Sequence, residues 1–105
     1  MIKIIKYLFD WMSGKPKTKI KKIVFGTLPN ATTKSVAHGL TSDQYARIIR
    51  FWGQTSGATT MPIPYVDVGS LANGIRLALN DTNIVIITAS NYSAYTATIY
   101  IEYEV

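Results

Sequence analysis

The C-terminal end of the chain carries a strict alternation of side chains. In residues 95–105, YTATIYIEYEV, apolar or aromatic residues alternate with mainly polar ones. Because successive side chains of a β-strand point to opposite sides, this pattern predicts a strand with one buried face and one outer face. The predicted buried positions are Tyr95, Ala97, Ile99, Ile101, Tyr103 and Val105, and the predicted outer positions are Thr96, Thr98, Tyr100, Glu102 and Glu104. The first set belongs to a core, and the second meets solvent or a neighbour.

Further β-prone segments precede this strand at intervals of about ten residues, which is typical of a sandwich or barrel. They are residues 17–27, 46–53, 60–66, 74–80 and 83–89. The last two are joined by NDTN, residues 80–83, whose asparagines and aspartate favour a turn, so we expect a hairpin. At 105 residues the chain has room for one modest core. We therefore predict an all-β fold, an antiparallel β-sandwich of the jelly-roll or immunoglobulin-like kind, over residues 17–105.

The first residues, MIKIIKYLFDWM, have a different pattern. Ile2, Ile5, Phe9 and Met12 recur at spacings of three and four, which predicts a short amphipathic helix or arm. The SGKP sequence at residues 13–16 ends it. The run is shorter than the roughly 20 residues that span a bilayer, and no signal-peptide cleavage site follows. Such a helix could dock on a partner protein, pack on its own domain or lie on a membrane surface. In the first and last cases it would attach the chain to another surface, and we therefore assign residues 1–16 to an anchoring segment.

The charge is concentrated in the same region. Residues 1–22 contain seven lysines and one aspartate, a net charge of +6, whereas the remaining residues contain four cationic and five anionic side chains, a net charge of −1. A nucleic-acid contact would have to use this basic segment, with phosphates neutralised without sequence recognition. A solvated basic arm is the alternative, and nucleic acid is not expected as a partner.

The side chains needed for catalysis or metal binding are scarce. The chain has no cysteine and a single histidine, His38, so it lacks a conventional zinc site unless a threefold oligomer brings three copies together. Glu102 and Glu104 share the outer side of the last strand, where exposure to water gives no means of raising a carboxyl pKa for acid catalysis. No nucleophile-elbow or phosphate-loop motif is present. We predict that the protein is not an enzyme and uses no cofactor or metal.

The histidine itself lies in LPNATTKSVAHGL, residues 28–40. Pro29 and Asn30 predict a turn, the following β-branched residues favour a strand, and Gly39 permits the bend that ends it. The His38 imidazole is then expected to donate to a nearby backbone carbonyl or to fill the seam between sheets. Among the aromatic residues, Trp52 and Tyr92, the latter in the polar segment ASNYSAY, are the candidates for a ligand or receptor contact.

Five segments, taken in order, resemble one family. They are WMSGKP at residues 11–16, residues 26–40 with LPN and KSVAHGL, residues 48–66 with PIP, residues 75–90, and the closing strand at 94–105. Together they are similar to a small β-domain of tailed-bacteriophage virion proteins, found at the C-terminal end of tail fibres, baseplate proteins and receptor-binding proteins. The resemblance covers nearly the whole chain. In the proteins that it resembles, this unit usually follows a long fibre or adaptor segment, whereas here it follows a twelve-residue amphipathic start.

This resemblance implies a non-enzymatic virion protein on the tail, baseplate or capsid surface, forming a homotrimer. The implied partners are other virion proteins, bound through the N-terminal segment, and a host cell-surface saccharide. Residues expected to anchor it on the particle, through apolar burial and attraction to an acidic groove, are Ile2, Ile5, Phe9, Trp11, Lys15, Lys17 and Lys19. A purely structural decoration protein of the capsid or tail remains an alternative, as does a basic nucleic-acid-binding accessory protein.

Overall fold

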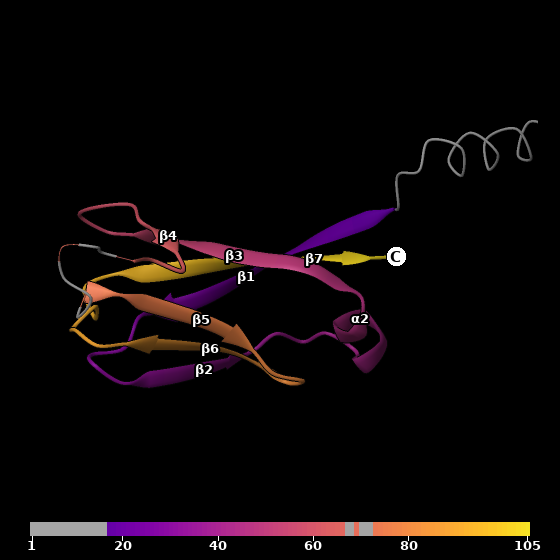
Figure 1. Ribbon diagram of the computed structural model, residues 1–105, viewed down its shortest axis with the longest axis horizontal. Helices are drawn as coiled ribbons and strands as arrows, with labels where there is room; N and C mark the ends of the chain where they lie inside the picture. Colours follow the sequence, from indigo (N-terminus) through magenta and orange to yellow (C-terminus); the bar gives the residue numbers. More distant parts are fainter. Residues whose placement is uncertain (1–16, 67–68, 70–72) are drawn as a thin grey trace, which may run out of the picture.

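Residues 17–66, 69 and 73–105 are described by a computed structural model, and they form two antiparallel sheets stacked face to face (Figure 1). The strands are β1 (Thr18–Thr27), β2 (Thr33–Ala37), β3 (Ile48–Ser56), β4 (Pro62–Ile63), β5 (Ile75–Leu79), β6 (Asn83–Thr88) and β7 (Thr96–Glu104). One sheet has the order β1-β7-β3-β4, and the other has the order β2-β6-β5. The predicted all-β sandwich is confirmed. The predicted helix or arm in residues 1–16 lies outside the described residues.

Strand β7 is the central strand of the four-stranded sheet and pairs with β1 on one side and β3 on the other. Ile99 and Ile101 are fully buried, and Ala97 and Tyr103 are nearly so, whereas the alternate positions are half-buried or exposed. The alternation therefore predicted the buried face of β7. Val105 is the exception, since it follows the end of the strand and is 57% exposed.

The three-stranded sheet closes the other side of the core. Ile84 and Ile86 on β6 have no solvent exposure, and Ile75 on β5 has 1%. The predicted hairpin of β5 and β6 is confirmed by their antiparallel register. At its turn the Asn80 side-chain oxygen accepts hydrogen bonds from the backbone N–H of Thr82 and of Asn83, at 3.0 and 2.6 Å. This side chain takes the place of a backbone acceptor, as asparagine does in tight turns.

A short helix, α2 (Ser42–Ala46), joins the two sheets at one end of the sandwich (Figure 1). The Thr41 hydroxyl accepts from the Gln44 N–H at 3.2 Å, and the Gln44 side chain accepts from the Thr41 N–H at 3.0 Å. This reciprocal capping box satisfies two backbone donors of the first turn. The helix holds the connection from β2 to β3 against the end of the core, where Tyr45 meets His38.

Gly53 lies at a close approach between β3 and β7 in the larger sheet. A Cβ at this position would lie 2.5 Å from Ile99 Cδ1 and 2.8 Å from the Thr98 carbonyl oxygen. Because one of these neighbours is backbone, it cannot move aside without distorting the strand pairing. The absent side chain at Gly53 therefore leaves the space that Ile99 fills between the sheets.

Candidate functional site

The His38 side chain is buried and its two ring nitrogens are both occupied. Nε2 lies 2.9 Å from the Asn80 carbonyl oxygen, and Nδ1 accepts from the Leu40 N–H at 3.0 Å. Since a backbone N–H can only donate, Nδ1 is the unprotonated nitrogen and Nε2 is the one that donates. The ring is 2% exposed and stacks on Tyr45 with centroids 5.7 Å apart. As predicted, His38 donates to a backbone carbonyl, and this geometry leaves no nitrogen available for catalysis or a metal.

The remaining predicted turn residues flank this histidine. Gly39 has a φ of 68°, the positive value that glycine favours, so its predicted role in the bend is confirmed. Pro29 is buried, and its carbonyl accepts from the Thr88 hydroxyl at 3.1 Å. Asn30 forms an isolated bridge with Asn91, and the left-handed conformation falls one residue later, at Ala31 with a φ of 49°. The turn therefore exists, but its sharpest point is shifted by one residue from the predicted pair.

Tyr92 is not placed where a ligand could reach its ring. It is 8% exposed, belongs to the hydrophobic core and packs against Tyr95 with ring centroids 5.8 Å apart. Its hydroxyl donates to the Asn73 carbonyl. The polar residues around it suggested an exposed loop, but the loop folds back and uses the tyrosine to close the end of the core. The expected surface contact at Tyr92 is thus corrected to a structural one.

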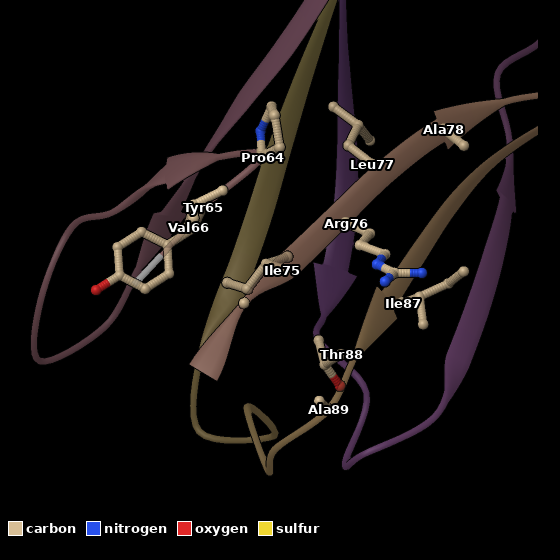
Figure 2. Close-up of a pocket in the computed structure, with 11 residues that line it drawn as sticks. Pro64, Tyr65, Val66, Ile75, Arg76, Leu77, Ala78, Ile87, Thr88 and Ala89 are labelled. Atoms are coloured by element: carbon tan, nitrogen blue, oxygen red, sulfur yellow. The ribbon is translucent and has the colours of Figure 1, made fainter. Parts of the chain in front are cut away.

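A groove of about 760 Å³ lies where the chain passes from β4 to β5 (Figure 2). Most of its described lining is apolar, including Val66, Leu77 and Ile87, and the one charged side chain among those residues is Arg76. The Thr88 hydroxyl, also at this groove, already donates to the Pro29 carbonyl. The described lining therefore offers apolar contact and one guanidinium, and it contains no acid and base placed for catalysis.

The outer face of the four-stranded sheet, defined as the side turned away from the smaller sheet, collects a different set of residues. Register partners on neighbouring strands share a face, so the strand pairing identifies its members. They are Thr18, Ile20, Lys22 and Val24 on β1, Thr96, Thr98, Tyr100, Glu102 and Glu104 on β7, and Arg50, Trp52, Gln54 and Ser56 on β3. Val24 is 73% exposed and Ile20 is 53% exposed, so this part of the face is open to solvent.

Two aromatic rings occupy the middle of the outer face. Trp52 on β3 and Tyr100 on β7 are register partners, and their rings stack with centroids 5.6 Å apart and planes inclined by 18°. Both side chains are half-buried. The Arg50 guanidinium carbon lies 4.8 Å from the centroid of the Trp52 ring, a cation–π distance. The predicted contact residue Trp52 is thus part of an aromatic pair on a solvent-facing sheet surface.

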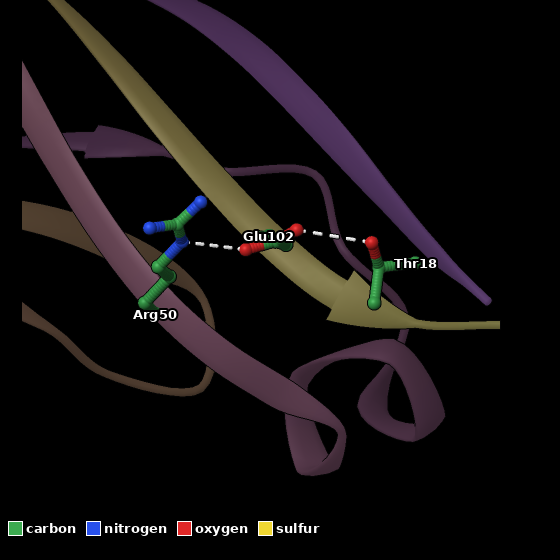
Figure 3. A network of polar contacts seen from close by, with 3 residues as sticks. All are labelled: Thr18, Arg50 and Glu102. Atoms are coloured by element: carbon green, nitrogen blue, oxygen red, sulfur yellow. Dashed lines mark hydrogen bonds and ion pairs between the residues drawn. The ribbon is translucent and has the colours of Figure 1, made fainter. Parts of the chain in front are cut away.

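A polar network next to the aromatic pair fixes Arg50 in this position (Figure 3). Arg50 Nε lies 2.5 Å from one carboxylate oxygen of Glu102, and the Thr18 hydroxyl donates to the other at 3.0 Å. The hydrogen bond from Arg50, followed by that from Thr18, lowers the pKa of Glu102 below its ordinary value. Glu102 is therefore ionised at neutral pH, which makes it unsuitable as a general acid beside Glu104.

Two of the residues expected to anchor the chain are described: Lys17 directly precedes β1, and Lys19 is the second residue of that strand. Lys17 and Lys19 are exposed, and the Lys17 carbonyl accepts from the Val105 N–H at 2.9 Å. The backbone at Lys17 is thereby tied to the C-terminal end of the chain. The other expected anchor residues, Ile2, Ile5, Phe9, Trp11 and Lys15, lie outside the described residues.

Neither a metal-binding cluster nor a membrane-spanning helix occurs among the described residues. Within residues 17–66, 69 and 73–105, no three His, Cys, Asp or Glu side chains gather closely enough to hold a metal ion. In those same ranges no helix has the length and hydropathy needed to cross a membrane.

Sequence reasoning identified Trp52 but missed the residues around it. Arg50, Tyr100 and Glu102 come together only through the register of β3 with β7. The signal present in the sequence was the alternation in the last strand, which placed Tyr100 and Glu102 on one side of it. The sequence does not show which strand pairs with the last strand, and that pairing decides which residues lie next to Tyr100 and Glu102.

Comparisons with known proteins add no assignment to this geometry. No protein-family model matches the chain, and no curated protein or solved structure shows significant similarity to it.

Proposed function

We propose that this chain is a non-enzymatic protein of a tailed-bacteriophage virion that contributes to attachment by contacting a saccharide of the host cell surface with the outer face of its four-stranded sheet. The phage assignment rests on the sequence resemblance set out above. The same resemblance supports a homotrimer that is bound to other virion proteins through its N-terminal segment.

The stacked pair of Trp52 and Tyr100 is the observation that supports attachment most directly. Aromatic side chains combine a large apolar surface with a polar edge, so they suit ligands such as sugars that are apolar on one side and hydroxylated on the other. Polar side chains that can bond to hydroxyl groups surround the pair, among them Gln54 and Thr98, which are register partners. Stacking surface and hydrogen-bonding groups therefore occur side by side on one rigid sheet.

The hydrogen bonds and ion pair made by His38 and Glu102 also favour binding over catalysis. The histidine is buried with both nitrogens bonded, and Glu102 is held in an ion pair. Acid–base catalysis needs a titratable group that is free to exchange a proton with a substrate, and neither His38 nor Glu102 is free in this way. The outer face instead presents a fixed arrangement of rings and charges, which is suited to recognition.

A glycan microarray of bacterial cell-surface polysaccharides tests the proposed attachment, with the full chain as the probe. We expect binding to a restricted set of glycans, and we expect the Trp52→Ala variant to lose at least tenfold in affinity for them. Phe51→Ala is the matched control, because it removes a ring from the next residue of β3, which is paired with Ile101 on the opposite side of the sheet. Binding by neither the parent nor the control, or equal binding by all three proteins, would count against attachment through this face.

A purely structural decoration protein is the second candidate, and the exposed apolar residues Ile20 and Val24 favour it. Apolar side chains on an open sheet suit contact with another protein. If this candidate is correct, particles lacking the chain adsorb to cells at the normal rate but lose their infectivity faster on heating. If attachment is correct, those particles adsorb poorly and have normal heat stability.

A further inference from the structure

The outer face has a charge pattern that restricts which saccharide it can bind. Lys22, Tyr100 and Trp52 are register partners across β1, β7 and β3, so a lysine stands directly beside the aromatic pair. Arg50 flanks the same pair along β3 and lies over the Trp52 ring. Two cationic side chains therefore border the two rings.

The nearest acidic residue does not offset both cations. Glu102 accepts from Arg50 through one carboxylate oxygen and from Thr18 through the other. No ion pair within 4 Å involves Lys22 among the residues that the structure describes. The ammonium of Lys22 is thus an uncompensated positive charge on an exposed part of the sheet.

The guanidinium of Arg50 also has N–H groups that Glu102 does not use. Only its Nε is used by Glu102, and in Figure 3 its two terminal amino groups point away from that carboxylate. Those amino groups make no hydrogen bond to any part of the chain that the structure describes. A guanidinium held by one carboxylate through Nε can still bind an anion through its remaining N–H groups.

We propose that the saccharide bound by the outer face is anionic, with its sugar ring on Trp52 and Tyr100 and its acidic group contacting Lys22 and Arg50. This inference rests on the proposed attachment function and adds the chemical class of the ligand. The shared chemistry is an anionic oxygen group, either the carboxylate of a uronic acid or the phosphate of a sugar-phosphate polymer.

The test compares three probes for binding to the full chain by isothermal titration calorimetry: a neutral maltohexaose, a hexamer of galacturonic acid and a maltohexaose that carries phosphate groups. We expect one or both acidic probes to bind at least tenfold more tightly than maltohexaose, with the stronger acidic probe identifying the carboxylate or phosphate. Raising the salt concentration from 50 to 200 mM should weaken that binding.

Two variants test whether Lys22 supplies the positive charge that the acidic probe contacts. Lys22→Gln should reduce the affinity for the acidic probe by about threefold to fivefold, the range expected for one exposed charge contact. Lys19→Gln removes the same charge from the same strand, but Lys19 is the register partner of the buried Tyr103 and lies on the other side of the sheet. This control should bind like the parent.

The outcomes separate this inference from the function on which it rests. Equal affinity for neutral and acidic probes, or a loss with Lys19→Gln in place of Lys22→Gln, would overturn the anionic ligand while leaving attachment intact. If the glycan microarray also shows no bound polysaccharide of any charge, the attachment function itself fails.

Discussion

Trp52 and Tyr100 lie opposite each other on β3 and β7, with ring centroids 5.6 Å apart on the outer face of the four-stranded sheet. Cross-strand aromatic contacts stabilise a sheet. On the other face of the same two strands, Phe51, Gly53 and Thr55 of β3 lie opposite buried residues of β7. Under the proposed function, the aromatic pair serves ligand binding as well as the stability of the sheet.

The variant Trp52→Ala should remain folded and lose only moderate stability, because the Trp52 side chain is half-buried on the outer face. Loss of the stacked contact should lower the free energy of unfolding by about 1 kcal/mol beyond the loss of buried area. Urea denaturation followed by circular dichroism measures this change. A fall several times larger would mean that the pair is mainly a structural feature of the sheet, and a selective loss of glycan binding could not then be attributed to contact.

His38→Ala should be more damaging to the fold. It leaves the Asn80 carbonyl and the Leu40 N–H without their partner, and an unmade bond at a buried site costs about 1–3 kcal/mol. Tyr45→Leu is the control, since it removes the stacked ring and keeps both hydrogen bonds. Urea unfolding should rank the two variants in this order. If His38→Ala were as stable as the parent yet no longer bound glycans, the structural role assigned to this histidine would be wrong.

Acidification should weaken the contact between β3 and β7 through Glu102. Its folded-state pKa lies below the ordinary value of 4.5, because the hydrogen bonds from Arg50 and Thr18 favour the carboxylate. The stabilising contribution is therefore complete above pH 4.5 and is lost as the pH falls through the lowered folded-state pKa.

This effect is measured by the urea midpoint at pH 6 and at pH 3. Glu102→Gln should show a smaller drop between the two pH values than the parent. Glu104→Gln is the matched control, because it removes a carboxylate from the same strand and leaves the Arg50–Glu102 pair in place. If both variants behaved like the parent, the network at Glu102 would have no part in acid sensitivity.

Gly53→Ala should destabilise the protein by about 1–3 kcal/mol, the usual cost of overpacking a core. Its new methyl group would meet Ile99 Cδ1 at 2.5 Å and the Thr98 carbonyl oxygen at 2.8 Å. Gln54→Ala, at the adjacent exposed position, should change stability far less. The thermal midpoints of the two variants give the comparison, and equal midpoints would show that β3 and β7 can shift to accept the methyl group.

The parts of the fold that the sequence predicts well are those governed by local periodicity. Alternation in β7 gives its buried face, and the turn residues beginning at Asn80 give the hairpin of β5 and β6. Helix α2 was not predicted, since five residues are too few to show a helical period. The only sequence signal was the pair Thr41 and Gln44, which has the spacing of a capping box.

The candidate site was harder to predict, because it depends on contacts between distant parts of the chain. The alternation in β7 places Tyr100 and Glu102 on one face, but only the register with β3 brings Arg50 and Trp52 next to them. The predicted surface contact at Tyr92 was wrong because its neighbours in sequence are polar, whereas its neighbours in space are the core residues that bury it.

The most direct test of the central proposal is competition for adsorption of the phage that, under this proposal, carries the protein. Host cells are incubated with an excess of the purified full chain, and the adsorption rate of the particles is then measured. The parent and Phe51→Ala proteins should both slow adsorption, and Trp52→Ala should not. Unchanged adsorption with the parent protein, or equal inhibition by Trp52→Ala, would contradict attachment through the outer face.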